Sequence, residues 1–256
     1  MSIFGRELVK LLRCFKNNYC KNNNNKYYNY HQIPILESNK GPIKFQSIKF
    51  LYSKSFTDVY YDDDDKNYPL STQDIWLRER DGKWECKTPM NLTPSMDSYH
   101  ELVTHQEIDK YLNKKLTPSS SSNDDDFSSR ISFKNRIINR YGLNEFCRIT
   151  TTRKHYFVDE EFTLDLDTTD FGHHIGELEL VVGNEEDVPK AEFKIAQFLK
   201  KHDWFFDTTS EVVMGKLTAY IMKFNRKQWE CMEKSGILKK KLFPESMDDV
   251  VNKGTN

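Results

Sequence analysis

Residues 161–182, EFTLDLDTTDFGHHIGELELVV, contain two alternating runs of apolar and polar residues joined by a turn rich in Gly and His. Successive side chains of a β-strand point to opposite faces. The first run therefore presents Asp165 and Asp167 on one face, and the second presents Glu177 and Glu179 on one face. The opposite faces are apolar, with Phe162, Leu164, Leu166, Leu178, Leu180 and Val182. We predict two strands, each with one apolar and one acidic face.

The acidic faces have two explanations. Like charges brought together raise one another's pKa and cost free energy, so carboxylates that converge need a compensating cause. In the first explanation they face bulk water, as one side of many antiparallel sheets does. In the second they hold a hard divalent cation such as Mg²⁺, which prefers oxygen ligands from a few carboxylates and from substrate phosphates. The two runs alone leave both explanations open.

The rest of the chain alternates short strand patterns with a few helical ones. Strand-like runs occupy 43–50, 57–61, 74–79, 84–87, 98–103 and 147–158, and Asp81-Gly82 predicts a hairpin turn. Helical spacing occupies 133–141, 189–202, 215–224 and 226–235, with Pro189 in a first helical turn. Residues 62–65 and 117–129 are expected to be solvated loops. This order predicts an α+β domain on one large antiparallel sheet or barrel with covering helices.

Basic residues follow the same alternation on other strands. In the run 76–80, Trp76, Arg78 and Arg80 share one face. On the return strand, Lys83, Glu85 and Lys87 share one face in the same way. One set of strands therefore carries cations and another carries acids. A barrel with both signs in its lumen suits a polyanion bound together with a metal ion. Arginines would grip phosphate oxygens, and carboxylates would hold the bridging cation.

Composition narrows the classes of function. A net charge of −1 argues against a nucleic-acid protein that works by general electrostatics, and no apolar run is long enough to suggest a membrane span. The five scattered cysteines lack metal-ligand spacing and fit reduced thiols. We therefore expect a cytoplasmic monomer. The basic, acid-poor residues 1–30 leave a mitochondrial location as the alternative.

Five separated motifs resemble those of the CYTH-domain, or triphosphate tunnel metalloenzyme, family. They are FTDVYYD (56–62), DIWLRERDGKWECKTP (74–89), YHEL (99–102), LDLDTTDFGHHIGELELVV (164–182) and GKLTAYIMKF (215–224). Within the family the chain is most similar to the animal-type thiamine triphosphatases. The resemblance implies an eight-stranded antiparallel β-barrel, the triphosphate tunnel, with a charged lumen. It also implies Mg²⁺-dependent hydrolysis of thiamine triphosphate to thiamine diphosphate and phosphate, with Mn²⁺ as a possible substitute.

The resemblance also implies roles for single residues. It assigns triphosphate binding to Arg78, Arg80, Lys87, Arg153 and Lys216, and metal binding to Asp165, Glu177 and Glu179, with Glu177 also contacting substrate. Glu101 matches a lumen acid, and Asp167 is a weaker candidate. Trp76 would offer its ring to the thiamine moiety. Tyr60 and Lys87 match a pair that helps to activate the attacking water.

The N-terminal region departs from the family pattern. The family begins with a strand reading Glu-x-Glu-x-Lys, but the expected position, residues 28–32, reads YNYHQ. Glu7 and Lys10 lie further upstream than expected and lack the spacing. Two alternatives to the thiamine assignment therefore remain. One is a hydrolase of inorganic or nucleoside triphosphates, and the other is a module that binds triphosphates without hydrolysing them.

These observations divide the chain into three parts. Residues 1–32 are expected to be a basic, Asn-rich and poorly ordered extension. Residues 33–235 are expected to form the CYTH-like domain, with a flexible insert at 117–129. Residues 236–256 are expected to form a C-terminal tail.

Overall fold

The computed structural model describes residues 7–13, 45–89, 97–118, 132–202, 205 and 214–238. These residues form a closed barrel of antiparallel strands in the order β1-β5-β4-β3-β2-β6-β7-β8. The strands are β1 (Glu7–Arg13), β2 (Ile48–Asp62), β3 (Trp76–Arg80), β4 (Lys83–Pro89), β5 (Asp97–Leu102), β6 (Asn144–Val158), β7 (Phe162–Thr169) and β8 (His174–Val182). The predicted α+β class and the antiparallel eight-stranded barrel are confirmed.

The first strand corrects the expectation for the N-terminal region. Strand β1 lies within residues 1–32, which we expected to be an extension, and it closes the barrel between β5 and β8. Its register runs from Glu7 opposite Val182 to Arg13 opposite Gly176. The partners of β1 lie far along the chain, so a local count of basic residues does not reveal its place. Residues 28–32 lie outside the described residues, as do most of the predicted insert and tail.

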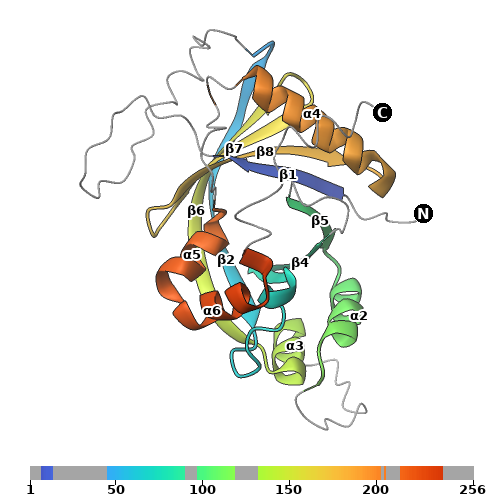
Figure 1. Ribbon diagram of the computed structural model, residues 1–256, viewed down its shortest axis with the longest axis vertical. Coiled ribbons are helices and arrows are strands. Elements are labelled where there is room, and N and C mark those ends of the chain that lie inside the picture. The colour runs from blue at the N-terminus through green and yellow to red at the C-terminus, as the bar shows by residue number, and fades with distance from the viewer. Residues whose placement is uncertain are drawn as a thin grey trace.

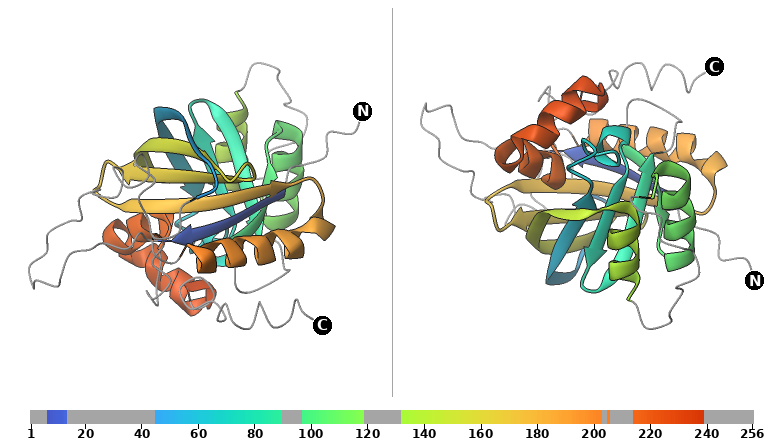
Figure 2. Two further views of the ribbon diagram at one scale, coloured as in Figure 1. Left: turned by 90° about the horizontal axis from the view of Figure 1, so that it is seen from above. Right: turned by 90° about the horizontal axis from the view of Figure 1, so that it is seen from below.

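The outer face of β7 and β8 packs against helix α4 (Val188–Lys201). The predicted helical stripe is confirmed, because Ile195, Ala196 and Leu199 are buried against Leu164 and Leu178 of the strands. Figures 1 and 2 show α4 lying along the side of the barrel that β8 and β1 form. The apolar faces predicted for 161–182 therefore point outward into a core, and the acidic faces point into the lumen.

A second outer core covers β3 and β4. Helices α2 (His105–Lys115) and α3 (Phe133–Tyr141) bury residues including Ile108 and Ile137 against Leu77 and Trp84. Helix α2 was not predicted, although Thr104 and Glu107 form a capping box at its start. Its local signal lay next to a strand-like run and was missed for that reason.

Helices α5 (Lys216–Phe224) and α6 (Arg226–Lys234) cover one end of the barrel (Figure 1). Ile221 of α5 and Met232 of α6 belong to the same buried cluster as Tyr60, Trp76 and Tyr99 of the strands. Two short 3-10 turns, Ser71–Gln73 and Glu185–Asp187, complete the described elements. Among the described residues, no helix combines the length and the apolar character needed to span a bilayer.

Strands β2 and β6 are longer than the alternating runs suggested. The predicted run 57–61 lies within the single strand β2 of 15 residues, which also contains the last three residues of the predicted run 43–50 and pairs with β6 along its length. The β3–β4 hairpin covers only the C-terminal part of β2, because β3 pairs with β2 from Asp58, which is opposite Arg80, to Tyr61, which is opposite Leu77. Its turn residues Asp81 and Gly82 have φ of 48° and 79°, so the predicted hairpin at Asp81-Gly82 is confirmed.

Candidate active site

The acidic faces of β7 and β8 meet inside the barrel. Asp165 lies directly opposite Glu177, and Glu179 lies opposite Thr163 one step along the sheet. Asp165, Glu177 and Glu179 each offer a carboxylate oxygen, and these oxygens all lie within 4.8 Å of one another. Asp165 and Glu177 are almost completely buried. Three oxygen donors this close together form a suitable site for a hard cation such as Mg²⁺.

Two basic side chains bind this acidic group. Arg153 of β6 donates from Nε and Nη2 to the two oxygens of Asp167, both at 2.7 Å, and from Nη2 to Glu177 at 2.7 Å. It also forms an ion pair with Asp165. Lys216, the first residue of α5, reaches inward and pairs with Asp167 and, at 2.9 Å, with Glu177. Lys216 is therefore a buried lumen residue rather than a solvated helix lysine.

Basic side chains share these carboxylates with the candidate metal site. Arg153, Lys216 and the imidazole of His155 pair with three of the acids, Asp165, Asp167 and Glu177. A divalent cation held by Asp165, Glu177 and Glu179 would therefore share carboxylates with these bases. The donor set, three carboxylate oxygens from two neighbouring strands, fits Mg²⁺.

The opposite wall of the lumen carries the remaining predicted cations. Arg80 grips Asp58 with Nε and Nη2, at 2.6 and 2.8 Å. Arg78 binds Glu85, with Nε at 3.0 Å, and its Nη1 lies 3.7 Å from Asp58. The guanidinium of Arg80 also lies 4.1 Å from the ring centroid of Phe56. Such contacts fix the planes of the guanidinium groups, which matters for binding phosphate in a fixed geometry.

Burial and charge shift the pKa values in this wall. Burial alone would raise the pKa of Asp58, but Arg78 and Arg80 lower it below its usual value. Burial opposes the charged form of Arg78 and of Arg153, yet nearby carboxylates raise the pKa of each arginine well above its usual value. Both arginines are therefore charged at any pH at which the protein is folded. They are permanent cations for an anionic ligand.

Tyr60 and Lys87 occupy neighbouring parts of the lumen. Tyr60 of β2 is opposite Arg78 of β3. Lys87 of β4 has Trp76 opposite it on one neighbouring strand and Glu101 on the other. Its Nζ binds the carboxylate of Glu101 at 2.8 Å. Burial, and then the charge of Asp58, raise the pKa of Tyr60. The phenol therefore keeps its proton at neutral pH and can donate a hydrogen bond, but it cannot act as a base there.

Trp76 lies at the end of the barrel that α5 and α6 cover. Its Nε1 donates to Asp74 at 2.8 Å, and Tyr99 donates to the same carboxylate oxygen at 2.9 Å. The ring belongs to the buried cluster that includes Tyr60 and Ile221. A packed apolar cluster therefore adjoins the charged part of the lumen.

His155 and Tyr52 extend the site toward the other end of the barrel. The Nδ1 atom of His155 binds an oxygen of Asp165. The ring of Tyr52 stacks on His155, with centroids 4.7 Å apart and an angle of 19° between the planes. The alternation that joins Arg153 and His155 on one face of β6 is visible in the sequence, but the contact with Asp165 is not.

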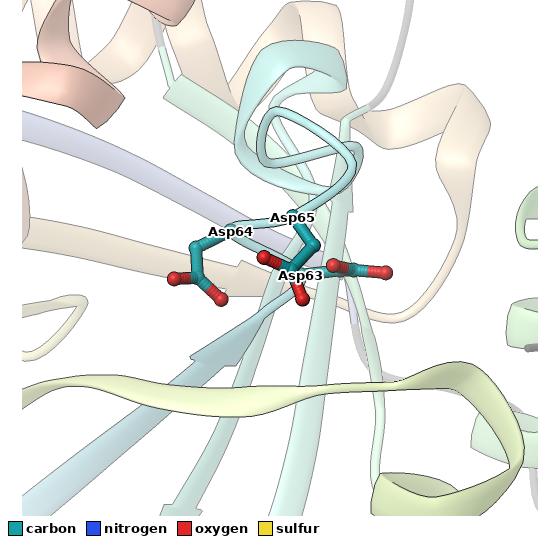
Figure 3. A group of neighbouring side chains, drawn as sticks. All are labelled: Asp63, Asp64 and Asp65. Carbon is teal, nitrogen blue, oxygen red and sulfur yellow. The ribbon is translucent and has the colours of Figure 1, made fainter.

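A second acidic cluster lies at the end of β2 and has a local explanation. Asp63, Asp64 and Asp65 are consecutive in a turn (Figure 3). Asp63 pairs with Lys66 at 3.0 Å, and Asp64 accepts a hydrogen bond from Asn144 at 3.0 Å. The expectation of a fully solvated loop at 62–65 is wrong for its first half, since Asp62 and Asp63 are buried. Backbone N–H groups donate hydrogen bonds to both carboxylates and so offset the cost of burying them.

Two lumen residues were not predicted from the sequence. Asp58 is the carboxylate that Arg80 and Arg78 share, and Phe56 lies against Arg80 and Arg153. Both lie on the same face of β2 as Tyr60, so the two-residue period could have placed them in the lumen. Among the predicted residues, the structure brings Asp165, Glu177, Glu179, Arg153 and Lys216 into one group, and places Arg78, Arg80, Lys87, Tyr60, Trp76 and Glu101 on β2 to β5.

Comparison with known proteins assigns the barrel to a family. A family model described as "CYTH domain" matches residues 46–204, which is more than half of the chain. The chain belongs to the CYTH domain family. The CYTH match begins after β1 and ends before Lys216, so the strand that closes the barrel and the inward-reaching lysine lie outside it.

Two curated relatives cover most of this CYTH protein. The thiamine-triphosphatase of Homo sapiens is 29% identical over an alignment of 190 residues, and the match covers 70% of this chain and 77% of that protein. The thiamine-triphosphatase of Macaca fascicularis is 28% identical over an alignment of 187 residues, and the match covers 69% of this chain and 76% of that protein. Both matches support the resemblance to animal-type thiamine triphosphatases seen in the sequence.

Solved structures resemble the chain more distantly. A protein from Pyrococcus horikoshii OT3 is 17% identical, with a TM-score of 0.46, and the match covers 84% of this chain and 99% of that one. Because that TM-score is below 0.5, the family assignment rests on the sequence match and on the barrel itself.

Proposed function

We propose that this CYTH protein hydrolyses thiamine triphosphate to thiamine diphosphate and phosphate, with Mg²⁺ bound at Asp165, Glu177 and Glu179. The observation that carries the proposal is the arrangement of these carboxylates beside Arg153 and Lys216 in a closed lumen. The curated relatives named thiamine-triphosphatase support the same substrate. A triphosphate has about four negative charges near neutral pH, so it needs several cations together with a metal ion.

The lumen arginines and lysines would bind the phosphate oxygens. Arg78, Arg80 and Arg153 are held by carboxylates, and binding requires them to exchange those partners for phosphate oxygens. The exchange keeps each guanidinium in a charge-assisted hydrogen bond, so the main cost is reorientation rather than desolvation. A bound Mg²⁺ supplies further positive charge for the phosphate oxygens and offsets the charge of the carboxylates that the cations leave.

Hydrolysis then requires a positioned water. The water oxygen adds to the terminal phosphorus while the bond from phosphorus to the bridging oxygen breaks. Thiamine diphosphate leaves with the electron pair, and the protons of the water remain on the released phosphate until it ionises in solution. Phosphoryl transfer asks mainly for positioning and charge stabilisation. Lys87, held by Glu101 at 2.8 Å, and the protonated Tyr60 would orient this water and stabilise the developing charge.

The apolar side chains around Trp76 would contact the thiamine moiety. Its ring lies among buried apolar side chains beside the charged lumen, which suits a substrate with an aromatic, cationic head and an anionic tail. The change Trp76→Ala should weaken the binding of thiamine triphosphate by roughly tenfold or more, while the binding of inorganic triphosphate should change little. An equal loss for both substrates would exclude the thiamine assignment and favour a general triphosphatase.

The register of β1 favours one other function, triphosphate binding without hydrolysis. The β1 residues opposite Glu179 and Glu177 are Lys10 and Leu12, so this strand offers no carboxylate at either position. The metal would then depend on ligands from β7 and β8.

Phosphate release distinguishes these functions. Purified full-length protein is incubated with thiamine triphosphate, inorganic triphosphate or ATP in the presence of Mg²⁺. Preferential release from thiamine triphosphate supports the proposal. Protection against thermal unfolding by thiamine triphosphate, without any release, would indicate the binding module instead.

A further inference from the structure

One row of residues crosses four neighbouring strands at the same level of the barrel. Tyr52 of β2 is opposite His155 of β6, His155 is opposite Asp165 of β7, and Asp165 is opposite Glu177 of β8. Residues that lie directly opposite one another on one face of an antiparallel sheet have adjacent side chains. The row therefore joins an aromatic ring at the rim to the predicted metal ligands.

The contacts along this row hold the carboxylate of Asp165 from one side. The Nδ1 atom of His155 binds Oδ1 of Asp165. An ionised carboxylate can only accept hydrogen bonds, so this contact with an ionised Asp165 requires the tautomer that carries a proton on Nδ1. Tyr52 stacks on the imidazole at 4.7 Å, which restricts rotation of the ring. The side chain of Asp165 is only 1% exposed, so its orientation depends on these neighbours.

The other oxygen of Asp165 has a partner that can leave. Oδ2 of Asp165 pairs with Arg153, and Arg153 also binds Asp167 and Glu177. In the proposed function Arg153 turns toward phosphate, which releases Oδ2 for a cation. Oδ1 stays bound to His155, because the stacked imidazole is fixed by Tyr52 rather than by the substrate.

We propose that His155, held by Tyr52, is a positioning residue that orients Asp165 toward a divalent cation shared with Glu177 and Glu179. This inference rests on the metal site of the proposed function. Hydrogen bonds from outer residues to metal ligands fix ligand orientation, and their loss typically weakens metal binding by about 10- to 100-fold. His155 therefore acts through Asp165 and does not itself touch the substrate.

A pair of matched variants tests the hydrogen bond. His155→Asn places an amide N–H near the position of Nδ1, and His155→Gln places it near the position of Nε2. Binding of Mn²⁺ to the full-length protein without substrate is measured by the loss of the electron paramagnetic resonance signal of free Mn²⁺. We expect His155→Gln to weaken Mn²⁺ binding by about tenfold or more, and His155→Asn to stay within about threefold of wild type. Equal affinity in all three proteins would overturn the inference.

The stacking contact has its own test. Tyr52→Phe keeps the ring and Tyr52→Ala removes it, so we expect weaker Mn²⁺ binding only in the alanine variant. Thermal unfolding in EDTA gives the control for a purely structural role. If His155→Gln and Tyr52→Ala lower the unfolding temperature but leave Mn²⁺ affinity unchanged, the residues only stabilise the wall and the inference is wrong. Failure of the wild type itself to bind Mn²⁺ would instead contradict the metal site of the proposed function.

Discussion

Replacing Arg153 by methionine should affect metal binding and hydrolysis in opposite directions. Arg153 pairs with Asp165, Asp167 and Glu177, and its side chain is 11% exposed. In the variant Arg153→Met, Asp167 and Glu177 keep their ion pairs with Lys216, and Asp165 keeps its contact with His155. Removing one partner of a buried ion pair typically costs 3–5 kcal/mol, so we expect the free energy of unfolding in EDTA to fall by about 4 kcal/mol.

A divalent cation should recover part of that loss. In the wild type the cation must share Asp165 and Glu177 with Arg153. In Arg153→Met that competitor is gone and the acidic group is more negative, so Mn²⁺ should bind at least as tightly as in the wild type. A ligand that binds only the folded state stabilises it, so added Mn²⁺ should raise the unfolding free energy more in the variant.

Hydrolysis should nevertheless fall, because a phosphate-binding cation has been removed. Loss of one preorganised donor to a developing oxyanion costs roughly 10²–10³ in kcat, and we expect a loss of this size for thiamine triphosphate. Arg153→Lys is the matched control: it keeps the charge but loses the fork, so its stability and rate should be intermediate. A methionine variant that binds Mn²⁺ more weakly, or that hydrolyses at the wild-type rate, would refute the reasoning.

Two further predictions concern stability. Asp62 is buried, and burial raises its pKa from 3.8 to about 6 although Ser71, Leu70 and Asp63 donate hydrogen bonds to it. Between these pH values the folded state holds a proton that the unfolded chain releases. The contribution of this group to stability is therefore lost as the pH rises, by about 3 kcal/mol in total. In urea unfolding, the stability of the wild type relative to Asp62→Asn should fall between about pH 4 and 7, and parallel pH profiles of the two proteins would contradict the raised pKa. The change Ile195→Ala leaves a cavity in the core under α4, so it should lower the free energy of unfolding in urea by about 2–5 kcal/mol. The rate of phosphate release at room temperature should stay unchanged. A loss of rate without a loss of stability would mean that α4 does more than cover the barrel.

Local patterns predicted the part of the fold in which each strand shows its two faces in the sequence. Leu164 and Leu178 point into the outer core, and Asp165 and Glu177 point into the lumen, because the two-residue period is unbroken there. The helix at 188–201 was predicted within a residue at each end because Pro189 and its apolar stripe agree. Helix α2 is the exception, because its capping box at Thr104 and Glu107 is local and was still missed.

Features that depend on distant partners could not be predicted in the same way. Strand β1 has a mixed basic and apolar sequence, and only the open edges of β5 and β8 reveal why it pairs there. The inward direction of Lys216 follows from the position of α5 over the end of the barrel. The contact of His155 with Asp165 likewise depends on the register of β6 against β7. In each case the missing information is which strand or helix lies next to which.

The most direct test of the account is Mg²⁺-dependent phosphate release from thiamine triphosphate by wild type and by Glu177→Gln. Glu177 accepts hydrogen bonds from Arg153 and Lys216 and belongs to the candidate metal-binding carboxylates. Glutamine has nearly the same size but no charge, so this one change tests the metal site together with its two basic partners. We predict that wild-type release stops in EDTA and returns with Mg²⁺, and that the folded Gln variant is slower by roughly 10² or more. Release that persists in EDTA, or that survives in Glu177→Gln, would contradict the proposed site.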